Sequence, residues 1–308
     1  MKALILSDFG REHLYIKETS APQISENDAL IKVQFAGIGE WDQFEINGGY
    51  HEMLNIKPEF PYICGSEGAG EIIKKGKNVH HLSIGDLVYA CSFLNEKGGF
   101  FAEYVAVNQD MIKRIPSHLS SAEASAISGV GTTALRGMMK LELGELDNII
   151  VHGASGGVDH LAVQLAKSIT NNVFAVASGE DGVQLCESMG VNALNGKSNL
   201  GDVEFSKFNK MLLTTQLEDY RTHTEDMLKP AVIAYPVGNY DVPESNDNQI
   251  EVIPYYGDLD KAIIEEFDYH VRNHKIRCNI SKVFDIKDFN NAYNHLEKHY
   301  TGKLVFRV

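Results

Sequence analysis

The stretch that decides the fold runs from Asn148 to Lys167 and reads NIIVHGASGGVDHLAVQLAK. It begins with a continuous β-branched run, Ile149 to Val151, which is typical of a strand buried on both faces of a parallel sheet. After a glycine-rich turn, apolar residues recur from Val158 at the spacing of an amphipathic helix. The stretch therefore predicts a strand, a tight turn and a helix in direct succession.

The turn contains three glycines, Gly153, Gly156 and Gly157. Glycine tolerates positive φ and close backbone approach, so N–H groups at the positive end of the helix can meet an anionic pyrophosphate. A plain tight turn could use the same glycines. The strand before the turn and the helix after it favour nucleotide binding.

Composition limits the classes of partner. The chain has 308 residues, enough for two domains, and its formal net charge of -14 argues against a nucleic acid or an anionic membrane surface as partner. No apolar run approaches the roughly 20 residues of a membrane helix, and the N-terminus turns polar too early for a signal peptide. Four dispersed cysteines without a CxxC pair fit reduced thiols. We expect a cytoplasmic protein.

The first 115 residues are β-rich, with short strand-like runs separated by turn signals, a pattern typical of a partly closed barrel. The predicted strands are 2–6, 14–18, 29–35, 71–74, 87–91 and 101–107. Within this region, the sequence GSEGAG at Gly65–Gly70 requires a backbone packed closely against another strand or a ligand.

From Ser120 the pattern changes to alternating helices and strands, which is typical of a doubly wound parallel sheet. Ser120 and Glu123 form a capping-box sequence, and glycines at 129 and 131 predict a break between two helices. The predicted helices are 120–128, 132–141, 182–189, 220–228, 259–273 and 287–300, and the predicted strands are 149–151, 172–177, 210–213, 231–237, 249–253 and 303–308.

Five motifs in this order, GSEGAG, GGFFAEYV, GTTAL, VHGASGGV and GKLVFRV, resemble the medium-chain dehydrogenase/reductase superfamily, and within it the quinone oxidoreductase branch. The resemblance covers nearly the whole chain. It implies an α/β fold with a GroES-like β-barrel domain in residues 1–121, completed by 255–308, and a Rossmann domain in residues 122–254. It also implies hydride transfer from a nicotinamide cofactor in a cleft between the two.

The zinc branch of that superfamily holds its catalytic metal with a Cys and with the His of a GHE motif. The matching positions here are Gly39 and Ser66, and the structural cysteine cluster is absent. Neither residue supplies the thiolate or imidazole that zinc prefers, so we expect no zinc. Without a metal, hydride transfer to a quinone or another conjugated carbonyl needs mainly correct positioning of the two reactants.

The resemblance also implies the positions of the site residues. Thr132 would approach the nicotinamide amide, and Gly238 would lie beneath the cofactor. Tyr50 and Asp42 match substrate-facing residues; taken alone, Tyr50 could equally be a barrel-edge aromatic on Pro61, and Asp42 a turn cap. The residues expected to line the pyrophosphate are Ala154, Ser155, Gly156, Gly157 and Val158.

Cofactor choice depends on the end of the second Rossmann strand, where an acid would bind a ribose hydroxyl and favour NADH. Ser178 stands there instead and leaves room for a 2′-phosphate, so the sequence favours NADPH, with NADH possible. Glu180 and Asp181 would repel that phosphate if they pointed inward.

Three departures from the family pattern leave a second function open. Asp159 replaces the third glycine of the usual GGVG, and its charge either lies near the pyrophosphate or sits in the first helical turn, where the macrodipole favours an acid. Gly39 and Ile46 replace an asparagine and an arginine, and the usual glycine pair is missing near Thr214. The alternative is a catalytically idle relative that acts as a nucleotide-binding sensor or a protein-interaction scaffold.

We also expect a homodimer. Members of the family commonly pair the last Rossmann strand across a two-fold axis, and residues 250–254 form a short strand whose open edge such pairing would cover. Pro254, which has no N–H to donate, is expected to bound that strand.

Overall fold

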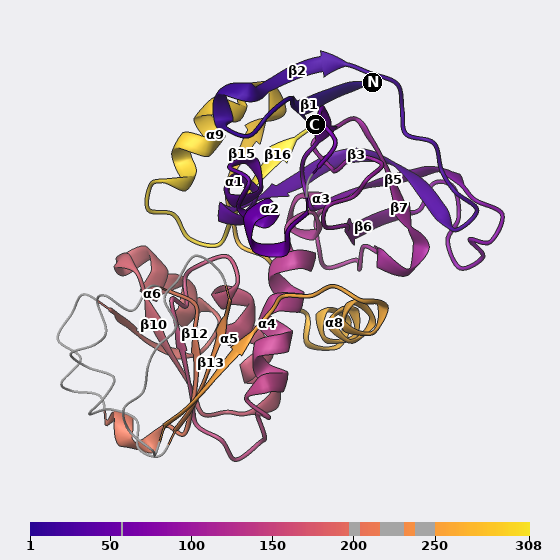
Figure 1. Cartoon of the computed structure of the whole chain (residues 1–308). Helices are drawn as coiled ribbons and strands as arrows, with labels where there is room; N and C mark the ends of the chain where they lie inside the picture. Colours follow the sequence, from indigo (N-terminus) through magenta and orange to yellow (C-terminus); the bar gives the residue numbers. More distant parts are fainter. Residues whose placement is uncertain (57, 197–203, 216–230, 238–249) are drawn as a thin grey trace. The chain divides into compact units, whose positions relative to one another are not determined.

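The computed structural model describes residues 1–56, 58–196, 204–215, 231–237 and 250–308 (Figure 1). Contacts divide the chain into two compact units, which we call unit 1 and unit 2. Unit 1 comprises Met1–Gly129, Leu259–Asp268 and Arg277–Val308, and unit 2 comprises Val130–Asp258 and Tyr269–Ile276. Both chain termini therefore belong to unit 1. Among the described residues, no helix is both long and apolar enough to cross a membrane.

Unit 1 is mainly antiparallel β-structure. One sheet has the strand order β15-β16-β3-β5-β6-β8, with β7 also paired to β3, and a small sheet has the order β2-β1-β4. Its elements are β1 (Lys2–Leu6), β2 (Leu14–Glu18), β3 (Asp28–Ile38), α1 (Glu40–Ile46), α2 (Gly49–Leu54), β4 (Tyr62–Ile63), β5 (Glu67–Lys75), β6 (Leu87–Cys91), β7 (Tyr104–Asn108), β8 (Ile112–Arg114), α3 (Ser121–Ala124), β15 (Ile280–Asp285), α9 (Phe289–Leu296) and β16 (Lys303–Arg307).

The end of the chain completes unit 1. Strand β16 pairs antiparallel with β3, from Leu304 opposite Ile38 to Arg307 opposite Phe35. Phe306 of β16 is fully buried against Phe101, with ring centroids 5.1 Å apart. Figure 1 draws this terminal segment in yellow beside the indigo N-terminal strands.

The glycines of GSEGAG serve backbone packing within unit 1. Gly65 has a φ of 101°, and a Cβ there would lie 2.6 Å from the Phe101 ring. A Cβ on Gly70 would overlap the Lys32 carbonyl of the adjacent strand β3. The sequence left open whether these glycines pack against another strand or a ligand. In the structure, Gly70 packs against the neighbouring strand β3 and Gly65 against the buried Phe101 ring.

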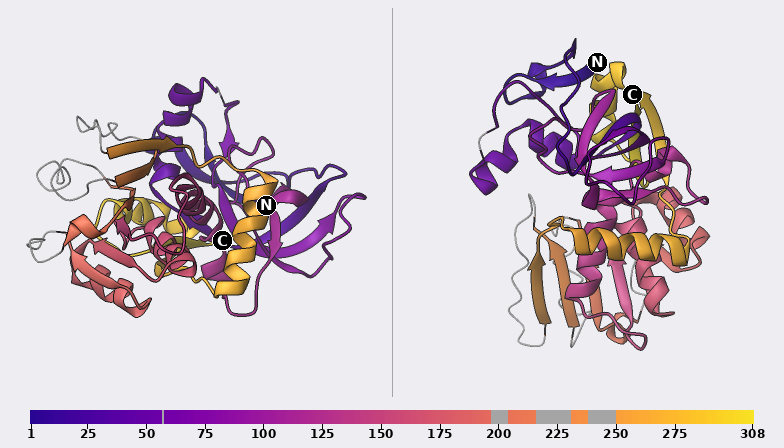
Figure 2. Two further views of the ribbon diagram at one scale, coloured as in Figure 1. Left: turned by 90° about the horizontal axis from the view of Figure 1, so that it is seen from below. Right: turned by 90° about the vertical axis from the view of Figure 1, so that its right-hand side faces the viewer.

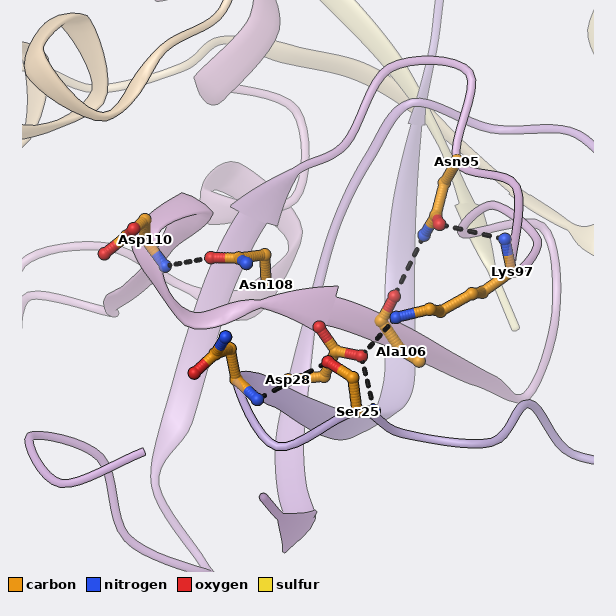
Figure 3. A network of polar contacts seen from close by, with 8 residues as sticks. Ser25, Asp28, Asn95, Lys97, Ala106, Asn108 and Asp110 are labelled. Atoms are coloured by element: carbon orange, nitrogen blue, oxygen red, sulfur yellow. Dashed lines mark hydrogen bonds and ion pairs between the residues drawn. The ribbon is translucent and has the colours of Figure 1, made fainter. Parts of the chain in front are cut away.

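A polar network links the loops at one end of unit 1 (Figure 3). The buried Asp28 carboxylate forms an ion pair with Lys97 and accepts a hydrogen bond from the Ser25 N–H at 2.7 Å. Burial alone would raise the pKa of Asp28, but the hydrogen bonds from Lys97 and Ser25 outweigh it and lower that pKa. Asn95 donates to the Ala106 carbonyl at 2.9 Å, so the network also fixes strand β7.

Unit 2 is built on a parallel sheet. Six described strands form this sheet in the order β11-β10-β9-β12-β13-β14, and every neighbouring pair is parallel. This order corresponds to the 3-2-1-4-5-6 order of a Rossmann sheet. In Figure 2 the orange strands β13 and β14 lie together at one edge. The elements are β9 (Ile149–His152), α5 (Asp159–Ile169), β10 (Val173–Ala177), α6 (Gly179–Ser188), β11 (Asn192–Asn195), β12 (Lys210–Leu213), β13 (Ala231–Pro236) and β14 (Ile250–Tyr255).

Helices contact this sheet, as their apolar faces predict. Helix α5 contacts β9 and β10, and its residues Leu161, Ala162 and Leu165 are fully buried. Helix α6 contacts β10 and β11. Two helices cross the boundary between the units along the chain: α4 (Ser128–Lys140) begins in unit 1, and α8 (Lys261–His274) has residues in both.

Several expected elements differ from the structure. The break predicted at residues 129 and 131 is wrong, because α4 runs through both glycines. Helices α1 and α2 were not predicted, and Pro254 lies inside β14, where it faces Tyr235, instead of ending it. Strands β11 and β15 were not predicted. The helix expected at 220–228 lies outside the described residues.

Candidate functional site

The glycine-rich turn between β9 and α5 is tight and fixed to the neighbouring strand. Gly153 has a φ of 85°, and the N–H groups of Gly153 and Ala154 both donate to the Val176 carbonyl of β10 at 2.9 Å. Gly156 closes the turn by donating to the Gly153 carbonyl at 2.7 Å. The N–H of Ala154 is therefore already used by the protein.

Other N–H groups of the turn are available. Those of Ser155, Gly157 and Val158 have no hydrogen-bond partner among the described residues. They immediately precede α5, whose first residue is Asp159, so the positive end of the helix dipole adds to their field. Such a group of N–H donors fits an anionic phosphate.

Asp159 lies in the first turn of α5, and its carboxylate also lies against the glycine-rich turn. It therefore has features of both positions that the sequence left open. It occupies the first turn of α5, and its side chain is nevertheless buried, with 4% exposure. The Thr214 hydroxyl, from the segment after β12, donates to Asp159 Oδ1. A Cβ built on Gly156 would lie 2.9 Å from Asp159 Oδ2, so the carboxylate lies directly against the turn.

The residues around Asp159 come from the ends of adjacent strands. Leu213, the last residue of β12, is opposite His152, the last residue of β9. His152 Nδ1 lies 3.1 Å from the Thr215 hydroxyl, and burial lowers the pKa of His152 to about 3, which keeps its imidazole neutral. This crevice between β9 and β12 is the topological switch point of the sheet, where ligands of open α/β sheets bind.

Ser178 stands at the end of β10, as the sequence indicated. It is exposed, and its N–H donates to the Ser155 hydroxyl at 3.1 Å, so the first two loops of the sheet are joined. Glu180 accepts a hydrogen bond from Asn195 of β11 at 3.3 Å, and both Glu180 and Asp181 are exposed. Thr132 is fully buried in α4. Gly238 lies outside the described residues.

In unit 1, the two residues expected to face substrate have well-defined contacts. Asp42 is buried in the first turn of α1, and its Oδ2 accepts the Gly39 N–H at 2.7 Å, which is the capping role that the sequence also allowed. Tyr50 packs edge-on against Phe44 and Phe93, at centroid distances of 4.8 Å and 4.5 Å. Tyr50 therefore belongs to an aromatic cluster with Phe44 and Phe93.

A buried ion pair next to these residues was not anticipated from the sequence. Lys303 Nζ lies 3.1 Å from Glu67 Oε1, with both side chains at most 3% exposed, and Glu67 Oε2 accepts the Gly129 N–H at 2.8 Å. Gly37 and Gly39 leave the necessary space, because Cβ atoms there would lie 2.7 Å from Glu67 and 3.1 Å from Lys303. The sequence signals for this ion pair were limited to Lys303 in GKLVFRV and to the glycines of AGIG at residues 36–39.

Two further carboxyl groups share this region. Burial raises the pKa of Asp42 to about 7, although the Lys303 charge and the Gly39 hydrogen bond lower it. Burial and the Asp42 charge raise the pKa of Glu45 to about 8. Burial works against the charge of Lys303, but Glu67 and Asp42 more than offset this and raise its pKa. Asp42 Oδ1 and Glu45 Oε2 have no hydrogen-bond partner among the described residues.

The chain can be compared with known proteins at this point. Residues 25–117 match the family model for the alcohol dehydrogenase GroES-like domain. The whole chain is similar to a solved quinone oxidoreductase from Coxiella burnetii, with 26% identity, a TM-score of 0.85 and coverage of 100% of this chain and 99% of that one. The chain belongs to the medium-chain dehydrogenase/reductase superfamily. Both the resemblance seen in the sequence and the fold class, a GroES-like domain with a Rossmann parallel-sheet domain, are thereby confirmed.

Relatives within the superfamily carry two kinds of name. An NAD-dependent alcohol dehydrogenase of Sulfolobus acidocaldarius is 26% identical over the full length of both proteins. A quinone oxidoreductase of Lama guanicoe is 31% identical, over 59% of this chain and 54% of that protein. An alcohol dehydrogenase of Geobacillus stearothermophilus is 29% identical, over 62% of each. The superfamily is one of oxidoreductases, and the names do not select between alcohol and quinone substrates.

Proposed function

We propose that this chain is an NAD(P)H-dependent reductase that transfers hydride to a quinone or another conjugated carbonyl without zinc. The observation that carries the proposal is the turn after β9, where the N–H groups of Ser155, Gly157 and Val158 are available at the switch point of a Rossmann sheet. These donors fit the pyrophosphate of a dinucleotide. The bound nicotinamide would supply the hydride, and the protein would hold the acceptor against it.

The absence of zinc is argued from the donor set. Gly39 and Ser66 stand at the positions of the metal ligands and offer neither thiolate nor imidazole. The ammonium of Lys303 lies 3.1 Å from the place where a side chain at position 39 would begin, so a cation already occupies that neighbourhood. In the described part of the chain, no group of three or more His, Cys, Asp or Glu side chains is arranged to hold a metal ion.

NADPH is the proposed cofactor, with NADH as the alternative. An exposed Ser178 after β10 leaves space for a 2′-phosphate, and the hydrogen bond between Glu180 and Asn195 holds one of the two nearby acids toward β11. Tyr50 and Asp42 remain the proposed residues on the substrate side. In this role the Tyr50 ring, fixed by Phe44 and Phe93, would present an apolar surface to a planar acceptor.

Steady-state oxidation of NADPH and NADH tests the proposal, with 1,4-benzoquinone and a simple enone as acceptors and primary alcohols in the reverse direction. We expect quinone-dependent oxidation that persists after dialysis against a chelator. Oxidation of alcohols only, or one zinc per chain retained by elemental analysis, would contradict the proposal. The assay includes both cofactors, so that the preference for NADPH over NADH is measured directly.

Asp159 favours a second candidate function, in which the chain is catalytically idle and serves as a nucleotide-binding sensor or a scaffold. Its buried carboxylate lies against the turn that would hold the pyrophosphate. Nucleotide binding without turnover of any acceptor would support the sensor, and absence of both would support the scaffold.

Assembly and location belong to the same proposal. Among the described strands, β14 pairs with β13 on one side and forms the edge of the sheet. An isologous pairing of two such edges would give a homodimer. A dimeric, cytoplasmic enzyme acting on a small molecule is consistent with the acidic net charge of -14.

A further inference from the structure

We propose that Asp159 sets the affinity of the dinucleotide site: its buried carboxylate, held by Thr214 against the turn between β9 and α5, weakens the binding of a diphosphate there. The inference rests on the proposed function only in assuming that this turn is the nucleotide site. It concerns the strength of binding and not the reaction that follows.

The Asp159 carboxylate lies against the glycine-rich turn. Oδ2 of Asp159 lies 2.9 Å from where a Cβ of Gly156 would be and 3.5 Å from where a Cβ of Gly153 would be. The carboxylate therefore fills the inner side of the turn whose outer N–H groups are available. Figure 1 labels α5, β10 and β12, the elements that meet at this point.

The Asp159 side chain is fixed in this position. The Thr214 hydroxyl donates to Asp159 Oδ1 and lies 3.2 Å from the His152 carbonyl oxygen, which ties the carboxylate to the ends of two strands. With 4% exposure, Asp159 has no route to turn outward into water without breaking this contact. The carboxylate is thus a permanent feature of the loop.

The negative charge of this carboxylate opposes a second anion in the turn. An anion at the N-terminus of α5 already interacts with the positive end of the helix dipole, which a bound phosphate would otherwise use. The charge also acts across a region of low dielectric, as its influence on two buried neighbours indicates: after burial itself, Asp159 is the next cause that raises the pKa values of Tyr255 and Cys186. A diphosphate in the turn would experience the same repulsion.

Asp159 differs from the other acids near the turn in its burial. Glu180 and Asp181 are exposed, so solvent and salt screen their charges. His152 is neutral, because burial lowers its pKa to about 3, and so it adds no positive charge beside the carboxylate. A buried charge is screened much less than an exposed one, and its effect should persist at high ionic strength.

Isothermal titration of NADPH and NADH into the full chain tests the inference, with Asp159→Asn as the main variant. Asparagine keeps the size of the side chain and an oxygen that can accept from Thr214, and it removes the negative charge. We expect both nucleotides to bind at least about tenfold more tightly to Asp159→Asn than to the unmodified protein, at low and at high salt. Asp159→Gly, which empties the space, should give an equal or larger gain.

Glu145→Gln is the matched control. It removes one negative charge from an exposed position of the same unit, before β9 and therefore at the opposite end of that strand from the turn. It should leave affinity within about twofold. Circular dichroism melting of each variant checks that the fold is intact.

The outcomes separate the inference from the proposed function. Equal affinities for the unmodified protein and both Asp159 variants, including no binding by any of them, would overturn the inference. A gain that vanishes at high salt would also overturn it, because a surface charge would then suffice. Tight binding by Asp159→Asn without reduction of any quinone or enone would support the inference and contradict the reductase. If the unmodified protein reduces quinones and the Asp159 variants bind nucleotide with the same affinity as the unmodified protein, the reductase is supported and the inference about Asp159 is contradicted.

Discussion

At the scale of the residue, the glycines of the nucleotide turn have different roles. Gly153 needs its positive φ of 85°, whereas Gly156 is not in the left-handed region and is constrained by space. The sequence gives no means of separating these two reasons, since both require glycine. The turn itself and its flanking elements could be predicted, because the strand run and the helical spacing on either side are local signals.

We predict that Gly156→Val lowers the affinity for NADPH more than tenfold, because the new side chain would collide with Asp159 and fill the space beside the turn. Nucleotide titration measures this. Gly144→Val is the control, since a Cβ at Gly144 would meet Asp147 at an ordinary 3.6 Å. Unchanged affinity in Gly156→Val would mean that the turn binds no nucleotide.

Glu45 is a buried acid that the sequence did not single out, because glutamate side chains are usually exposed. Burial raises its pKa from 4.5 to about 8, so the folded state keeps a proton that the unfolded state loses above about pH 5. The contribution of Glu45 to the free energy of unfolding is therefore fully present below its pKa in the unfolded chain. This contribution is lost as the pH rises toward its pKa in the folded protein.

We accordingly predict that Glu45→Gln raises the free energy of unfolding by about 1–3 kcal/mol at pH 8 and changes it little at pH 5. Urea unfolding at several pH values measures the difference. Glu52→Gln, an exposed site on α2, should show no such trend. Parallel stability curves for Glu45→Gln and the unmodified protein between these pH values would disprove the claim.

At the scale of the element, tertiary contacts explain where sequence patterns failed. Two glycines predict a helix break at 129–131, yet α4 continues, because the Gly129 N–H donates to Glu67 and a side chain there would meet Trp41 at 2.5 Å. Propensity is a weak guide where packing requires a small residue. Helix α1 was missed since its cap is glycine; the informative signal was Asp42, three residues on, which accepts the Gly39 N–H.

The ion pair between β16 and β5 provides a prediction for elements far apart in sequence. Lys303→Met leaves the Glu67 carboxylate buried without its cation and should destabilise the fold by about 3–5 kcal/mol. Adding Glu67→Gln should restore much of that loss, because the remaining buried charge is removed. Denaturant unfolding of the single and double variants gives the two values. A double variant no more stable than Lys303→Met would contradict a role for the buried charge.

At the scale of the whole molecule, the fold class followed from the order of motifs, whereas the buried charges of unit 1 did not. The alternation of strands and helices is written locally along residues 149–213 and predicts the parallel sheet. Residues 37, 39, 67 and 303 meet only because β16 returns to pair with β3, and such long-range contacts leave no periodic signal. The carboxylate of Asp159 could be predicted only in part. The sequence indicated its place at the start of a helix, but not its contact with Thr214.

Strand β14 is at the edge of the sheet among the described strands, which leads to a prediction about assembly. Sedimentation at micromolar concentration should give the mass of two chains, because pairing of two β14 edges would cover the N–H and C=O groups that no described strand pairs. Val252→Pro should shift the protein to the mass of one chain, with circular dichroism to check folding. A single-chain mass that persists as concentration rises would count against the dimer, and a dimeric Val252→Pro would exclude β14 as its interface.

The proposed reaction is direct hydride transfer from a nicotinamide to a conjugated carbonyl without a metal. Mass spectrometry of the product follows the transferred hydrogen, using chelator-dialysed protein, NADPH carrying deuterium at the transferred position of C4, and an enone acceptor. We expect one deuterium, bound to carbon, in each molecule of reduced product, and no change in this result when zinc is added. A product without deuterium, or deuterated product formed only after zinc is restored, would contradict it.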